Sequence, residues 1–123
     1  MTSEQIIIYS ILGLIIFMYI RKQILARGLN NYSGSEAKER MKSGSILLDV
    51  RTSAERSRNS IPSSIHIPLH ELSSRLSELE KHKGKEIICY CASGNRSVSA
   101  GIKLKKAGFI VGNLRGGIAS WNF

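Results

Sequence analysis

Cysteine is scarce in this 123-residue chain: there are two, and both lie in the segment Cys89-Tyr90-Cys91. Two thiols separated by one residue do not form the disulfide framework of a small secreted domain. On a strand, such neighbours would also make a strained disulfide. The pattern therefore favours a reducing compartment, with one reactive thiol and with Cys89 as a small apolar residue of the core.

Motifs for metals and nucleic acids are also missing. The three histidines (His66, His70 and His82) have no matched pair of cysteines, and His70-Glu71 lacks the second histidine of a metalloprotease helix. We therefore expect no metal site. Acidic residues are few, 9 against 18 Lys and Arg, so the net charge is +9 and attracts anions. Without a helix-turn-helix or stacking-aromatic motif, we expect no nucleic-acid partner.

One long hydrophobic run is present near the N-terminus. Residues Ile6–Ile20 contain no charge, and ten of the fifteen are Ile, Leu or Phe. A bilayer requires about 20 residues, and the helix reaches that length if it continues through Leu25 while Arg21 and Lys22 extend to the head groups. Glu4 and the lack of a small-x-small site argue against a cleaved signal peptide. We predict a transmembrane helix, with a buried core helix as the alternative.

The chain divides into three parts on this basis. Residues 1–27 are the predicted anchor with its basic flank, residues 28–34 a polar, turn-rich linker, and residues 35–123 a single domain without internal repeats. Three basic residues follow the hydrophobic run within the first part. By the positive-inside rule, we expect a single-pass protein of the cell membrane whose domain faces the cytoplasm.

Short apolar runs alternate with helical patterns throughout the domain. Strands are predicted at 46–50, 65–67, 87–91 and 109–114, and helices at 35–42, 52–58, 70–80 and 98–107. Strands that alternate with helices indicate an α/β fold, with a small parallel sheet flanked by helices.

Cys91 lies at the carboxyl end of an apolar strand, where a small glycine-containing loop leads into a helix. Ligands bind at this carboxyl end of the strands in an open α/β sheet. A helix N-terminus and a nearby cation, here Arg96, lower the pKa of a thiol, and successive backbone N–H groups form a nest for negative charge. The residues leave two alternatives open: a nucleophilic cysteine in an anion-binding cradle, or a buried structural cysteine before an ordinary turn.

Several short motifs follow one another along the domain. They are Leu47-Leu48-Asp49-Val50-Arg51-Thr52, Ala54-Glu55, Ile61-Pro62, Ile67-Pro68-Leu69, Cys91-Ala92-Ser93-Gly94-Asn95-Arg96-Ser97, Gly108-Phe109, and Gly116-Gly117-Ile118 with Trp121. In order and spacing they resemble a single-domain rhodanese, a sulfurtransferase, over about residues 33–123. The family often has His-Ile-Pro-Gly-Ala where this chain has Ser60-Ile61-Pro62-Ser63-Ser64, which alters a turn and not the sulfur chemistry.

The resemblance implies a role for each motif. Cys91 would be the catalytic nucleophile that holds a sulfane sulfur as a persulfide, and Asp49 and Arg51 would organise the site. The substrate-binding loop would consist of Ala92, Ser93, Gly94, Asn95, Arg96 and Ser97. Arg56 or Arg58 would add positive charge beside it. The donor would be thiosulfate or a similar small anion, the acceptor a thiol, cyanide or a protein, and no cofactor would be required.

Two other functions fit parts of this pattern. The first is a membrane-tethered persulfide carrier or partner-binding module with little turnover of thiosulfate. The second is a cysteine phosphatase or arsenate reductase, enzymes whose loop has five residues between cysteine and arginine. Four residues separate Cys91 from Arg96 here, and this smaller loop suits a single sulfur atom better than a phosphate.

Overall fold

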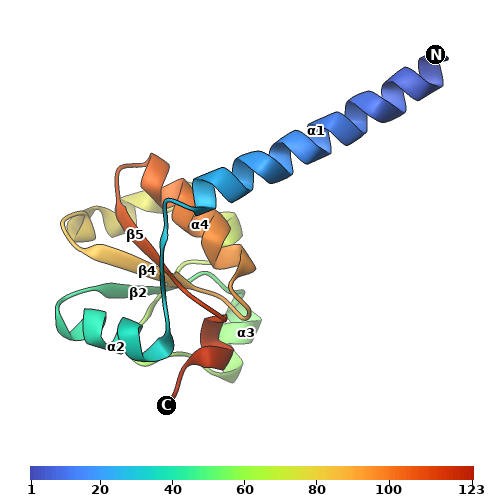
Figure 1. Cartoon of the computed structure of the whole chain (residues 1–123). Coiled ribbons are helices and arrows are strands. Elements are labelled where there is room, and N and C mark those ends of the chain that lie inside the picture. The colour runs from blue at the N-terminus through green and yellow to red at the C-terminus, as the bar shows by residue number, and fades with distance from the viewer.

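The centre of the computed structural model, which describes residues 1–123, is a five-stranded parallel sheet of order β1-β5-β4-β2-β3 (Figure 1). The strands are β1 (Asn30–Tyr32), β2 (Ile46–Asp49), β3 (Ile65–His66), β4 (Glu86–Tyr90) and β5 (Ile110–Leu114). The α-helices are α1 (Ser3–Ala26), α2 (Gly34–Lys42), α3 (Ser53–Arg58) and α4 (Asn95–Lys106), and the 3₁₀ helices are η1 (Leu69–Ser74), η2 (Leu76–His82) and η3 (Gly117–Ser120). The predicted α/β class with a parallel sheet is confirmed.

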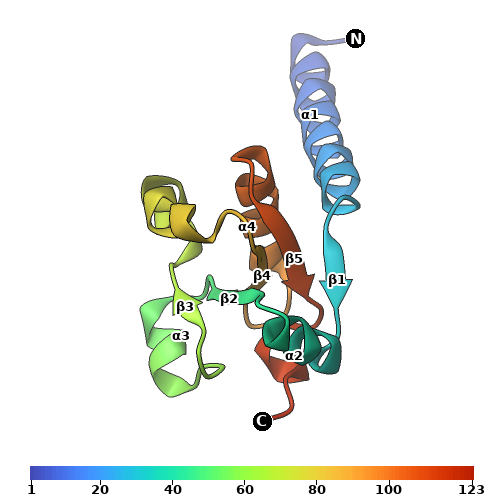
Figure 2. The same ribbon diagram turned by 90° about the vertical axis from the view of Figure 1, so that its left-hand side faces the viewer.

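The sheet separates two apolar clusters, and the alternation of side chains along β4 assigns residues to each. Ile87, Cys89 and Cys91 pack into the cluster formed with α4, η1 and η2. Ile88 and Tyr90 pack into the smaller cluster formed with α2 and η3. Successive strand residues point to opposite faces, so the period of two places Cys91 on the face that α4 covers. Figure 2 shows the strands side by side with these helices around them.

Helix α1 projects away from the domain, and only its C-terminal end contacts the domain, at α4 (Figures 1 and 2). None of its residues is buried, so the alternative of a core helix is wrong. At about 1.5 Å per residue, its 24 residues extend for about 36 Å, and the helix is long and apolar enough to cross a membrane. A signal sequence at an N-terminus has the same features. Helix α1 is therefore a candidate membrane span.

The predicted linker contains strand β1, which the sequence pattern did not reveal. Its three residues pair with β5, and Tyr32 is the one buried side chain among them. The Tyr32 ring lies where a side chain at Gly112 would otherwise project, so glycine in β5 permits this edge strand to pack. Three polar or aromatic residues are too few to show a strand period.

The segment predicted as one helix at 70–80 consists of two 3₁₀ helices, η1 and η2, which meet at Arg75. Leu72 and Leu79 are buried and Leu76 packs against the same cluster. Apolar residues spaced by three and four also align on a 3₁₀ helix, which has three residues per turn. Helix α4 begins at Asn95, three residues before the predicted start.

Candidate active site

Cys91 lies one residue beyond β4, where the chain turns into α4. Gly94 has φ of +105°, a left-handed conformation that residues with a side chain rarely adopt. This turn brings the Gly94 N–H to 3.0 Å from Cys91 Sγ. Helix α4 has no side-chain N-cap, so the N–H groups of its first turn remain available to an anion at the sulfur.

A chain of buried polar side chains extends from Cys91 into the sheet. The Cys91 thiol donates to Ser97 Oγ at 3.5 Å, and Ser97 Oγ donates to Asn113 Oδ1 at 2.6 Å. Asn113 Nδ2 in turn donates to Asn31 Oδ1 at 3.0 Å. Asn113 was not among the predicted site residues, although a polar residue within the apolar strand β5 was a signal for it. The chain fixes the Ser97 hydroxyl beside the sulfur.

The two cysteines differ in acidity. Burial raises the pKa of Cys91, but the hydrogen bond with the Ser97 side chain and those from the backbone N–H groups of Ser93, Gly94 and Ser97 outweigh it and hold that pKa below its ordinary value of 9.0. For Cys89, burial and the neighbouring Cys91 raise the pKa to about 12. Because the thiolate is the nucleophile, Cys91 is the cysteine suited to attack.

A buried ion pair lies at the end of β2. Arg51 Nε and Nη2 donate to the two carboxylate oxygens of Asp49 at 3.0 and 2.9 Å, and Arg51 Nη2 also donates to the Asn59 carbonyl oxygen at 2.6 Å. Burial raises the pKa of Asp49, but the bonds from Arg51 and Arg56 outweigh it and lower the pKa. The network ties β2 to the segment after α3, and neither member of the pair contacts the Cys91 sulfur.

The two arginines suggested as additional cations lie elsewhere. Arg56 Nη1 donates to Asp49 Oδ2 at 3.1 Å and to Ser64 Oγ at 3.0 Å. Arg58 is exposed at the end of α3. The structure therefore places Arg56 in the Asp49 network and brings neither arginine to the loop.

Arg96 has a carboxylate partner that the sequence did not reveal. Its Nη1 and Nη2 donate to Glu55 Oε1 and Oε2 at 2.6 and 2.8 Å. Glu55 also completes the capping box of α3 with Thr52, and Thr-x-x-Glu was the signal for its position. A cleft of about 310 Å³ adjoins this pair. It is lined by Val50, Thr52, Pro68, Leu69, His70, Arg96 and Lys103.

The Glu55–Arg96 pair predicts an acid-dependent stability. Arg96 lowers the pKa of Glu55 from 4.5 to about 2, so the pair stabilises the folded state fully above pH 4.5 and its contribution is lost as the pH falls toward 2. Both side chains are partly exposed, and we expect a contribution of about 1 kcal/mol after screening. Glu55→Gln retains the capping box, so thermal unfolding of this variant, followed by Trp121 fluorescence, should depend less on pH over that range. If the unfolding temperatures of the wild type and of Glu55→Gln changed equally with pH, the stabilising role of the Glu55–Arg96 pair would be contradicted.

Fold and site together define a class: a parallel α/β domain whose cysteine sits at a strand end, inside a loop of backbone N–H groups. The family model of the rhodanese-like domain matches residues 33–123. A sulfurtransferase of Allochromatium vinosum is 40% identical over 77 residues, which are 62% of this chain and 70% of that protein.

Solved structures give the same answer. A rhodanese-related protein from Thermoplasma volcanium is 35% identical, with a TM-score of 0.69, and the match covers 75% of this chain and 89% of that protein's chain. A thiosulfate sulfurtransferase from Pseudomonas aeruginosa is 29% identical, with a TM-score of 0.69 over 77% of this chain and 19% of its own. The chain belongs to the family of rhodanese-like domains and of the sulfurtransferases built on them.

Proposed function

We propose that the protein transfers a sulfane sulfur from thiosulfate or a similar anionic donor to a thiophilic acceptor. The Cys91 thiolate attacks the outer sulfur of thiosulfate, the bond between the two donor sulfurs breaks, and sulfite leaves with its electron pair. An acceptor such as a thiol or cyanide then attacks the terminal sulfur of the Cys91 persulfide and regenerates the thiolate. Two half-reactions through a covalent intermediate give ping-pong kinetics.

The observation that carries this proposal is the hydrogen bonding of Cys91 Sγ. The Gly94 N–H lies 3.0 Å from the sulfur, and the first turn of α4 has no side-chain cap. The same N–H groups would surround the terminal sulfur of a persulfide, whose negative charge fixed dipoles stabilise without reorganisation. Ala92, Asn95 and Arg96 complete the loop. Asp49 and Arg51 would act by holding the neighbouring backbone.

We also propose that α1 anchors the domain to the cell membrane, with the domain in the cytoplasm. Support comes from the uncharged run at 6–20, from the exposure of that run, and from the basic residues Arg21, Lys22 and Arg27 that follow it. A reducing cytoplasm is also compatible with two free cysteines.

The test is intact-mass spectrometry of the full-length protein in detergent after incubation with thiosulfate. We expect the protein to gain the mass of one sulfur atom, peptide mapping to place it on Cys91, and cyanide to remove it as thiocyanate. A phosphatase would leave the mass unchanged here and would hydrolyse a phosphate ester. No gain from thiosulfate would overturn direct transfer from this donor.

One observation favours a persulfide carrier as the second candidate. Arg96, the cation expected to bind the donor, is held by both carboxylate oxygens of Glu55. A carrier charged by a partner protein would not require a free arginine for thiosulfate. Its signature would be loading of Cys91 by a protein persulfide but not by thiosulfate alone.

A further inference from the structure

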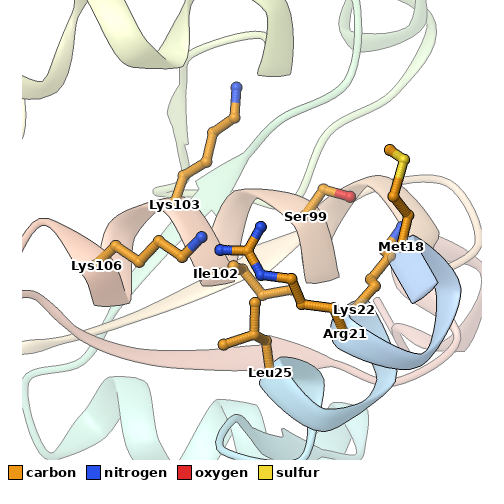
Figure 3. Close-up of a pocket in the computed structure, with 8 residues that line it drawn as sticks. All are labelled: Met18, Arg21, Lys22, Leu25, Ser99, Ile102, Lys103 and Lys106. Carbon is orange, nitrogen blue, oxygen red and sulfur yellow. The ribbon is translucent and has the colours of Figure 1, made fainter. Parts of the chain in front are cut away.

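A basic pocket lies between the last turns of α1 and the outer side of α4 (Figure 3). Its volume is about 270 Å³. The residues that line it are Met18, Arg21, Lys22 and Leu25 from α1 and Ser99, Ile102, Lys103 and Lys106 from α4. The pocket thus has four basic residues along its wall, one hydroxyl and an apolar floor of three side chains. The Lys103 ammonium extends away from Arg21 and Lys106 and donates to Ser73 Oγ at 3.4 Å.

The cations of this pocket have no carboxylate partners: every Asp and Glu that forms an ion pair in the structure does so elsewhere. In Figure 3 the Arg21 guanidinium and the Lys106 ammonium extend from opposite helices toward the same space. Like charges directed into one pocket repel each other unless an anion lies between them. The pocket therefore has the electrostatics of an anion site.

The position of the pocket along α1 indicates where that anion resides. The uncharged residues 5–20 of the helix extend for only about 24 Å, less than the hydrocarbon core of about 30 Å. The backbone of Arg21 and Lys22 therefore lies at the edge of the hydrocarbon core, and their long side chains extend to the lipid head groups. A second pocket of about 290 Å³ lies beside the first at the same level of α1, and it is lined by Phe17, Ile20, Arg21, Ile24 and Leu25.

We propose that this pocket binds the phosphate of an anionic phospholipid, with the head group between Arg21 and Lys106 and the upper acyl chain along the apolar side of α1. The proposal rests on the membrane anchoring proposed above. The bound lipid would bridge α1 and α4, and so hold the domain in one orientation at the membrane surface. A hydrogen bond within the protein already joins α4 to the end of α1, because Lys105 Nζ donates to the Gly28 carbonyl oxygen at 2.8 Å.

Native mass spectrometry of the full-length protein tests the proposal. The protein in nonionic detergent is mixed with equal amounts of phosphatidylglycerol and phosphatidylcholine, and we expect it to retain phosphatidylglycerol preferentially. The double variant Arg21→Gln/Lys106→Gln removes two charges and leaves a shorter but polar side chain at each position. Each basic residue near an anionic lipid surface contributes about five-fold in affinity, so we expect the preference to fall roughly 25-fold.

Arg27→Gln/Lys81→Gln is the matched control, because it removes one Arg and one Lys that do not line the pocket. We expect it to retain the wild-type preference. Equal losses of the preference for phosphatidylglycerol in both variants would show a general charge effect and overturn the proposal. In a separate sample with inorganic phosphate, retention of phosphate by a protein that does not retain the lipid would also overturn it.

Flotation of the wild-type protein with phosphatidylcholine vesicles separates this proposal from the anchor. A wild-type protein that floats but shows no preference for phosphatidylglycerol would overturn only the proposed lipid binding in the pocket. A wild-type protein that does not float would overturn the anchor, and the lipid site with it.

Discussion

Cys91→Ser is expected to abolish the gain of sulfur from thiosulfate completely, while Cys89→Ser retains it. The serine hydroxyl is a far weaker nucleophile than the thiolate of Cys91, whose pKa is lowered by hydrogen bonds from the backbone N–H groups of Ser97 and Gly94. Cys89 is fully buried, and its pKa of about 12 keeps it protonated. The measurement is the intact mass of each variant after incubation with thiosulfate.

The Cys89→Ser variant makes this comparison informative. It also replaces a sulfur by an oxygen, at a cysteine two residues earlier that packs into the same apolar cluster. It therefore reports any general effect of removing a sulfur from the core. If the Cys91→Ser variant still gained a sulfur atom from thiosulfate and the Cys89→Ser variant did not, the assignment of the nucleophile would be reversed. Loss in both variants, with normal unfolding curves, would indicate that both thiols take part.

The pH dependence of loading follows from the same geometry. Hydrogen bonds to the sulfur lower the pKa of Cys91, so the thiolate fraction at neutral pH exceeds that of an ordinary cysteine. The rate of sulfur loading falls when the Cys91 thiolate becomes protonated.

In the thiol state Ser97 Oγ accepts from Cys91 and donates to Asn113. Asn113 therefore fixes the Ser97 hydroxyl, although it does not touch the sulfur.

The parts of the fold that follow from local patterns were predictable from the sequence. The strand that ends at Tyr90 and the glycine-containing loop after it placed Cys91 at the carboxyl edge of the sheet. The helices predicted at 35–42 and 52–58 are both present, and each begins with a capping box, at Ser33 and at Thr52. These signals act over a few residues, which is the range over which capping and alternation operate.

The parts that depend on contacts between distant segments were not predictable. Glu55 and Arg96 are 41 residues apart in sequence and meet only when α3 lies beside the Cys91 loop. Asn31 belongs to a segment read as a linker, yet it ends the polar chain that begins at Cys91. A single sequence carries no local signal for such pairs, because their partners come from other elements of the sheet.

Gly117→Ala is expected to destabilise the protein and to disrupt the Cys91 loop. Gly117 has φ of +65°, and an added Cβ would overlap the carbonyl oxygens of Cys91 and Ala92. The left-handed backbone costs about 1–2 kcal/mol for a residue with a side chain, and forced overlap in a packed site adds about 1–3 kcal/mol. The adjacent Ile118 N–H donates to the Cys91 carbonyl oxygen at 2.9 Å, so relief of the overlap moves the residue that carries the nucleophile. Thermal unfolding and sulfur loading measure the two effects.

Gly44→Ala separates backbone strain from the overlap at the loop. Gly44 has φ of +105°, but nothing lies within 4 Å of an added Cβ, so this variant bears only the left-handed cost of about 1–2 kcal/mol. We expect its rate of sulfur loading to match that of the wild type at temperatures where both are folded. Gly117→Ala should lose more stability and should load sulfur more slowly even when folded, because its Cβ displaces the loop itself. Equal stability losses, with equal loading, would mean that the turn at Gly117 does not position Cys91.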